Sequence, residues 1–272
     1  MATSNPAFSR NPAFSAQGAQ TATPVLSGDE LQQMYNAPSA GALDTDRMTY
    51  EDTIVKSALC FAVLVVAAVA GWMLTPGLPF LPFLGAIVGL VLGLVNTFKK
   101  EPSPGLIVGY AAAEGLFVGG ISYVFESMFG GGLVLQAVLA TLVVVGVTLA
   151  LFASGKIRAS KKATKIFLIA MVGYLVFSLI NMGMMIFGAT SGAFGLRGGD
   201  IPGTNIPLGV VIGLLAVVMA AYSLVLDFDF IQRGVNNRAP RKFGWSGAFG
   251  IMVTVVWLYV ELLRLFAILR SN

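Results

Sequence analysis

The chain is organised into long apolar blocks separated by short polar connections. A helix of about 20 mostly apolar residues is long enough to cross the roughly 30 Å hydrocarbon core of a bilayer. Each block reaches this length, and prolines or glycine runs interrupt several of the connections. The pattern predicts an all-α polytopic membrane protein with seven transmembrane helices, at residues 55–74, 80–98, 104–128, 132–153, 165–188, 206–231 and 244–269.

The first 48 residues differ from the rest in composition. They are rich in Ala, Ser, Pro and Gln and poor in large apolar residues, which predicts a disordered cytoplasmic tail (1–48) before a seven-helix transmembrane domain (49–272). The sequence Asn-Pro-Ala-Phe-Ser occurs twice, at residues 5–9 and 11–15. This repeat is either a docking motif for membrane-protein partners or part of a low-complexity tail. No apolar segment with a cleavage site opens the chain, so we expect no signal peptide.

Charged residues are too scarce for a water-soluble protein. They make up 11% of the chain, against 56% hydrophobic residues, whereas soluble domains carry about 25% charged residues. The surface is therefore expected to face the lipid bilayer. The net charge of +4 and the pI near 9.3 do not indicate a nucleic-acid partner, because the basic residues lie in short loops between apolar blocks.

The basic residues are concentrated in alternate connections. The second, fourth and sixth connections contain eleven of the 17 basic residues, the first and third contain none, and the fifth contains only Arg197. Short cytoplasmic loops of membrane proteins are enriched in Lys and Arg. The alternation predicts a multi-pass protein of the cell membrane, with a cytoplasmic N-terminus and an extracellular C-terminus.

The chain contains no histidine and one cysteine, Cys60, which lies within the first apolar block. These counts exclude a Ser-His-Asp triad, a histidine-ligated zinc site, an intrachain disulfide and a thiolate metal cluster. The sequence Gly-Gly-Asp at residues 198–200 lies in a connection and does not provide the motif of an intramembrane aspartyl protease. We expect no enzymatic activity and no cofactor.

A few carboxylates lie within the predicted spans, where each costs at least ~2.5 kcal/mol on insertion and is a functional candidate. Glu114 lies in the middle of the third span and is either a functional carboxylate or a hydrogen-bonded group that joins helices. Asp227 and Asp229 lie in the sixth span, about 200° apart around the helix, and cannot both face one site. Asp227 is deeper, and Asp229 is expected to meet Arg233 or solvent.

The last span carries polar residues on one side. Glu261 and Arg264 are three residues apart, so we expect an internal ion pair. Thr254 lies seven residues before Glu261 and falls on the same stripe, within about 20°. This stripe is expected to face the interior of the bundle, where Asn181 of the fifth span is a further polar candidate.

Three segments match the pattern of a known family. YSLVLDFDFI at residues 222–231 looks like an aliphatic run that ends in Asp, WLYVELLRLFAIL at 257–269 like a closing Leu-Leu-Arg helix, and YAAAEGLFVGGIS at 110–122 like a small-residue third helix. In this order they resemble the Bax inhibitor (transmembrane Bax inhibitor motif) family, which includes YccA-like bacterial proteins. The resemblance covers roughly residues 50–270, and the tail and the DFDF variant look most like the actinobacterial branch.

The resemblance implies a central seventh helix surrounded by six others, and a pH-sensitive calcium leak. In bacterial family members, two aspartates on the last two helices share a proton and gate the pore. Asp227 matches the first position, whereas Thr254 occupies the second, so the coupled pair is absent. We hypothesise that Asp227 and Glu114 bind the cation and the proton, with Thr254 as an oxygen ligand. Glu261 and Arg264 are expected to act as an internal lock.

Two other functions remain open. A transporter that couples protons to a small solute predicts saturable uptake and, often, related halves of the chain, which the sequence does not contain. A membrane scaffold with a stress-regulatory role, bound to membrane-protein partners through the tail, predicts normal behaviour after the buried carboxylates are neutralised. The cation leak, in contrast, requires Asp227.

Overall fold

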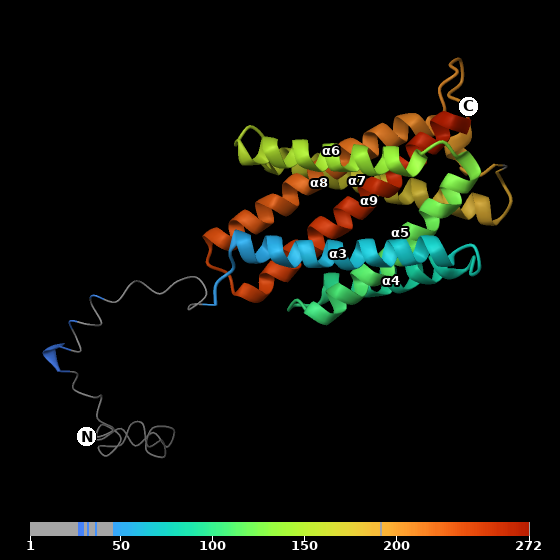
Figure 1. Cartoon of the computed structure of the whole chain (residues 1–272). Helices are drawn as coiled ribbons and strands as arrows, with labels where there is room; N and C mark the ends of the chain where they lie inside the picture. Colours follow the sequence, from blue (N-terminus) through green and yellow to red (C-terminus); the bar gives the residue numbers. More distant parts are fainter. Residues whose placement is uncertain (1–26, 30–31, 33–35, 37–45, 191, 272) are drawn as a thin grey trace, which may run out of the picture. The chain divides into compact units, whose positions relative to one another are not determined.

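The computed structural model describes residues 27–29, 32, 36, 46–190 and 192–271, and the chain divides into two compact units, residues 1–45 and 46–272. The repeat and most of the predicted tail lie outside the described residues. In the described part of the second unit, seven helices are long and apolar enough to cross a membrane, and no strand is present. The all-α, seven-span prediction is confirmed. The helices are α3 (Tyr50–Leu74), α4 (Leu81–Phe98), α5 (Pro104–Phe129), α6 (Leu133–Ala153), α7 (Lys161–Ile186), α8 (Leu208–Asn236) and α9 (Gly244–Ser271) (Figure 1).

Some helices extend beyond the apolar blocks because polar residues stabilise their ends. α3 begins at Tyr50, whereas the apolar pattern predicted its start near residue 55. Thr49 caps this helix by accepting a hydrogen bond from the backbone nitrogen of Asp52 at 3.1 Å, and such caps stabilise helices by about 1 kcal/mol. α8 likewise continues through a polar turn to Asn236. The apolar pattern did not predict these turns because they lie outside the apolar stretch that crosses the hydrocarbon core of the bilayer.

The segment before α3 also belongs to the helical unit, which begins ahead of the expected boundary between residues 48 and 49. Met48 is buried, and its backbone nitrogen donates to the Ala239 carbonyl at 2.8 Å. The backbone nitrogen of Arg241 donates to the Asp46 carbonyl at 2.9 Å. These hydrogen bonds attach the segment to the α8–α9 connection.

Glycines allow α3, α4 and α5 to pack closely. Gly119 of α5 lies so near α3 that a Cβ atom on it would overlap the backbone of Ala68. Gly85 of α4 approaches α5 in the same way, and a Cβ atom there would lie 2.8 Å from the Ala113 carbonyl oxygen. In lipid, helices associate through van der Waals contacts of this kind rather than through the hydrophobic effect. The three helices therefore form one tightly packed group.

α9 is the most buried of the seven spans. It packs against α8, α3, α6 and α5, and Trp257 of α9 makes an edge-to-face contact with Tyr174 of α7. α4 packs instead on α5 and, less extensively, on α3 (Figure 1). The structure thus places α9 in the core of the unit, whereas a complete ring of six helices around α9 stays a prediction.

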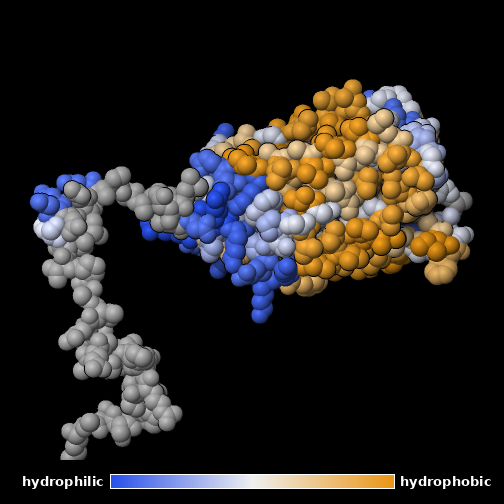
Figure 2. All heavy atoms as spheres, turned by 60° about the horizontal axis from the view of Figure 1, so that its bottom comes forward, coloured by the Kyte–Doolittle hydropathy of each residue, from blue (hydrophilic) through white to orange (hydrophobic). Residues whose placement is uncertain are grey.

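The connections that are rich in basic residues lie at one end of the helical unit, called here the basic end. Lys242 of the α8–α9 connection forms an ion pair with Glu101 of the α4–α5 connection at 2.8 Å. The α6–α7 connection is hydrogen-bonded to Tyr222 of α8. At the opposite end, Phe129, the last residue of α5, stacks on Phe194 of the α7–α8 connection. Figure 2 shows hydrophilic residues gathered at an end and hydrophobic residues along the flank, as in a protein embedded in lipid.

Candidate functional site

Asp227 lies on α8 and faces α9, where its carboxylate has a hydroxyl partner. The Thr254 hydroxyl of α9 donates to Asp227 Oδ2 at 2.7 Å. Ser223, one turn before Asp227, places its own hydroxyl 3.2 Å from that of Thr254. Gly250 leaves room for the carboxylate, since a Cβ atom there would lie 2.8 Å from Asp227 Oδ1. The structure therefore brings the predicted residues Asp227 and Thr254 together at the α8–α9 interface.

The Asp227 site, defined by Asp227, Ser223 and Thr254, offers oxygen atoms without a positive charge. Thr254 is 4% exposed and Asp227 is half-buried. Among the described residues, no lysine or arginine forms an ion pair with Asp227. A carboxylate beside hydroxyl oxygens suits either a proton or a hard cation such as calcium.

Glu114 lies on α5 and faces α4. Its Oε1 atom lies 2.7 Å from the place that a Cβ atom on Gly89 would occupy, so this glycine provides the space for the carboxylate. Among the described residues, no group of three or more Cys, Asp or Glu side chains is arranged to hold a metal ion. The two carboxylates that the sequence analysis paired, Asp227 and Glu114, therefore face different helices.

Asp229 lies closer to the basic end than Asp227. It forms an ion pair with Arg233, one turn later on α8, at 2.6 Å. The Arg233 side chain is 65% exposed, so the pair lies at the surface of the unit. The two aspartates of α8 have separate partners, as their spacing around the helix predicts.

Glu261 is the centre of an ionic network between α7, α9 and the α7–α8 connection. It is 1% exposed and forms the predicted ion pair with Arg264. Arg197 of the α7–α8 connection also binds it, with Nη1 at 3.1 Å from Glu261 Oε2. The hydroxyl of Tyr174, on α7, donates to the same carboxylate. The expected lock between Glu261 and Arg264 thus has two further members that the sequence analysis did not identify.

Arg197 is held in place by a short 3₁₀ helix, η3 (Gly195–Gly198), in the α7–α8 connection. Asn181 of α7 anchors this segment, because its side-chain oxygen accepts from the Leu196 backbone nitrogen at 2.7 Å. Gly195 has a positive φ of 57° and no room for a Cβ atom beside Asn181. One signal of this role was present in the sequence. Arg197 is the single basic residue in the first, third and fifth connections, where the alternation of basic connections does not require one.

A second ionic cluster, also missed by the sequence analysis, lies at the basic end. Lys56 of α3 is nearly buried, pairs with Asp52 one turn earlier, and donates to the Arg241 carbonyl at 2.8 Å. Arg241 Nε in turn lies 2.9 Å from Asp52 Oδ1. Nearby, the hydrogen bond from Lys242 lowers the pKa of the exposed Glu101 carboxyl. These contacts join the start of α3 and the α4–α5 connection to the α8–α9 connection.

A family model described as Bax inhibitor 1 like matches residues 5–271. The chain belongs to the Bax inhibitor 1-like family. This membership confirms the family that the three sequence segments resemble. The match begins at residue 5 and so includes most of the tail, which the resemblance over residues 50–270 did not cover. A search of curated proteins found no match to the chain.

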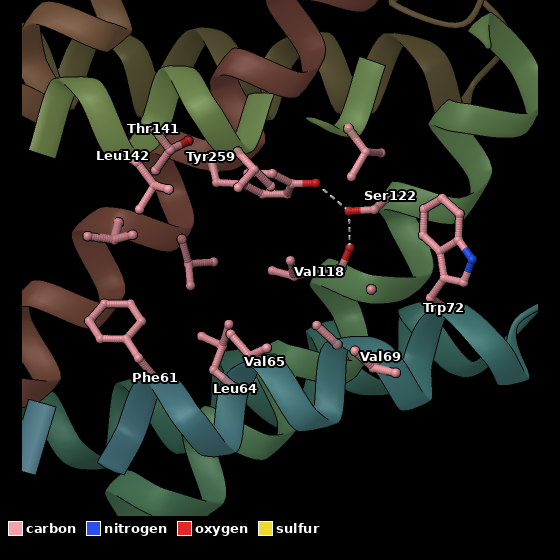
Figure 3. A pocket seen from close by; sticks show the side chains of 16 residues that line it. Phe61, Leu64, Val65, Val69, Trp72, Val118, Ser122, Thr141, Leu142 and Tyr259 are labelled. Carbon is pink, nitrogen blue, oxygen red and sulfur yellow. Dashed lines mark hydrogen bonds between the residues drawn. The ribbon is translucent and has the colours of Figure 1, made fainter. Parts of the chain in front are cut away.

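This Bax inhibitor 1-like protein also has an apolar crevice of about 450 Å³ between α3, α5, α6 and α9. Figure 3 shows Phe61 and Leu64 of α3 on one side and Leu142 of α6 on the other. The hydroxyls of Ser122 and Tyr259 lie 2.6 Å apart at its inner wall. Because these polar groups satisfy each other, the crevice offers contacts to hydrocarbon rather than ligands for an ion.

Proposed function

We propose that this Bax inhibitor 1-like protein is a pH-sensitive cation leak of the cell membrane, with calcium as the permeant ion and Asp227 as its sensor. One observation carries the proposal. Asp227 is a half-buried carboxylate at the interface of α8 and α9, beside Thr254 and Ser223, and no described basic residue pairs with it. An uncompensated carboxylate within a membrane span is a functional residue by default.

The proposed response to pH differs from that of a coupled carboxylate pair. Thr254 donates a hydrogen bond to Asp227 but has no proton to exchange near neutral pH. Asp227 then titrates as a single group, whereas two carboxylates in one site titrate in two macroscopic steps. The proposal therefore includes a flux that follows one protonation step. Glu114 belongs to a separate position at the α4–α5 interface and is proposed as a second, independent carboxylate of the conduction path.

The basic end is proposed to be cytoplasmic, with the N-terminus inside and the C-terminus outside. The basic connections α4–α5, α6–α7 and α8–α9 support this orientation through the positive-inside rule. In a Cys60→Ser background, the cysteine of Lys99→Cys should be protected from a membrane-impermeant maleimide in intact cells. The cysteine of Thr204→Cys should be labelled. The reverse labelling pattern would contradict the orientation.

The test of function is calcium flux into proteoliposomes that contain the purified full chain, measured over about pH 5 to 8. We expect a flux that changes with pH in the wild type and loses this dependence in Asp227→Asn. Asp229→Asn is the matched control, because it removes a carboxylate two residues away that already has an ionic partner. Absence of flux at every pH from folded protein, or equal pH dependence in wild type and Asp227→Asn, would reject the proposal.

A further inference from the structure

A second cavity, of about 540 Å³, lies near the opposite end of the unit, between α5, α7, α9 and the η3 segment. Its polar wall contains Arg197, Glu261 and Arg264, and Ser178 of α7. Its remaining wall is mostly apolar or aromatic and includes Trp257 of α9 and Met182 of α7. Cavities of this size accommodate small organic ligands, which are usually oriented by a few polar groups in an apolar wall.

The charges on the polar wall do not balance. Two guanidinium groups, from Arg197 and Arg264, share the single carboxylate of Glu261. Two other carboxylates at this end, those of Glu126 and Asp200, are not part of the cavity wall. Glu126 accepts from the backbone nitrogens of Gly132 and Val134, and Asp200 forms no ion pair with a described residue. The cavity wall therefore carries a net positive charge, and such a charge at membrane depth is stabilised by an anion.

Some N–H groups of the Arg264 guanidinium have no hydrogen-bond partner among the described residues. Arg197 uses both terminal nitrogens, Nη1 on Glu261 and Nη2 on Ser178 at 3.1 Å. Arg264 engages Glu261 through Nη1 alone, and no other partner of its guanidinium is found among the described residues. Its side chain is 28% exposed and lines the cavity. A guanidinium with free donors binds carboxylate or phosphate oxygens in a bidentate geometry.

We propose that this cavity binds an amphiphilic oxyanion, with its carboxylate or phosphate on Arg264 and its apolar body beside Trp257 and Met182. The inference does not depend on the proposed cation leak. Glu261 lies seven residues beyond Thr254 on α9, about 10 Å along the helix, so the two sites are separate. The shared chemistry of the ligand is an oxyanion on an apolar chain, whether its source is a free solute or a lipid headgroup.

Trp257 provides a direct readout, because a bromine atom in contact with an indole quenches its fluorescence. The purified full chain is titrated with ω-bromooctanoate and, separately, with the uncharged ω-bromooctanol. We expect saturable quenching by the carboxylate that is absent in Trp257→Phe, and no comparable quenching by the alcohol at the same concentration. Equal quenching by both probes would show hydrophobic partitioning and overturn the proposal.

Arg264→Gln tests the assigned ligand-binding group. In this variant, Glu261 keeps Arg197 and Tyr174 as partners, so the network retains an ion pair. We expect at least about tenfold weaker binding of ω-bromooctanoate, as for loss of one charge-assisted contact. Arg264→Lys keeps the charge and should recover part of the affinity. If the Gln variant does not fold, the affinity of Arg264→Lys relative to the wild type is the test. Arg233→Gln, at the basic end, is the control with unchanged binding. Wild-type affinity in both Arg264 variants would overturn the proposal.

The two possible sources of the oxyanion, a lipid headgroup and a free solute, are distinguished by reconstituting the protein in two kinds of bilayer. One contains brominated phosphatidylglycerol and the other brominated phosphatidylcholine. Trp257 quenching by the first alone, relieved by octanoate and reduced in Arg264→Gln, assigns a lipid headgroup. Quenching by neither lipid, with ω-bromooctanoate binding retained, assigns a free solute. Both results support the proposal. Equal quenching by the two lipids that is unaffected by Arg264→Gln or octanoate would contradict it.

Discussion

Two carboxylates on neighbouring parts of the bundle have opposite surroundings. Glu261 is almost fully buried and receives two guanidinium groups and a tyrosine hydroxyl. Asp227 is half-buried and receives one hydroxyl group, from Thr254. A buried charge with several charged partners is held in one ionisation state and geometry, and breaking such a network leaves unpaired charges. The proposed function requires the opposite of Asp227, a carboxylate without a cationic partner that exchanges a proton or a cation.

This contrast assigns different roles to residues of the same type. The Glu261 network connects α9 to α7 and to the α7–α8 connection through contacts far apart in sequence. The Asp227 site connects α8 and α9 through weak, neutral donors. The first is therefore expected to determine stability, and the second to determine the response to pH. Substitutions at the two carboxylates should therefore have separable effects on stability and on flux.

Glu261→Gln should destabilise the protein most. It leaves Arg197 and Arg264 without a carboxylate, and removal of one member of a buried ion network costs about 3–5 kcal/mol. Thermal unfolding of the purified protein in detergent is the measurement. Asp229→Asn removes a carboxylate from a pair whose arginine is 65% exposed and should cost less than about 1 kcal/mol. Equal destabilisation by the two substitutions would refute the special role of the Glu261 network.

Thr254→Asp should convert the Asp227 site into a coupled pair of carboxylates. The two side chains are in hydrogen-bond contact, at 2.7 Å, so the two carboxyl groups are expected to titrate as one coupled pair. Calcium flux should then change over a wider pH range and in two steps. The near-isosteric Thr254→Val variant, which removes the hydroxyl donor without adding a charge, should retain a single step. A single step in Thr254→Asp would show that this position does not couple to Asp227.

Asp227→Asn should change stability little, in contrast to Glu261→Gln. The amide oxygen of Asn can still accept the Thr254 hydroxyl, so the expected loss is below about 1 kcal/mol. Unfolding in detergent measures this effect beside the flux experiment. A loss comparable to that of Glu261→Gln would make Asp227 a structural residue and remove the distinction between the two regions.

Glu101→Gln should have the smallest effect, because the Glu101–Lys242 pair is exposed at the basic end. Lys242 lowers the Glu101 pKa from its ordinary value of 4.5, so any stabilisation is present above that value. This stabilisation is lost as the pH falls through the lower pKa of the folded state. The unfolding temperatures of wild type and Glu101→Gln should therefore differ slightly at neutral pH and converge in acid. A difference that grows in acid would contradict the assignment.

Contacts within one helix were predictable from spacing. Glu261 with Arg264 and Asp229 with Arg233 are three and four residues apart, a separation that places side chains on one helix face whatever surrounds the helix. The contact of Asp227 with Thr254 was suggested through the family resemblance, which placed both at matching positions. The partners of Arg197 were not predictable, since this residue lies 64 positions from Glu261 in the chain.

The sequence by itself determined the seven spans and the alternation of basic connections. These properties depend on the local density of apolar residues, because a helix in lipid satisfies its own backbone hydrogen bonds. The tertiary structure decided which polar groups meet. The direction in which Glu114 points, toward α4, and the entry of Arg197 into the Glu261 network depend on the rotation of each helix and on close contacts at glycines such as Gly89 and Gly195. Packing between helices sets these rotations. The apolar pattern along the chain does not specify them.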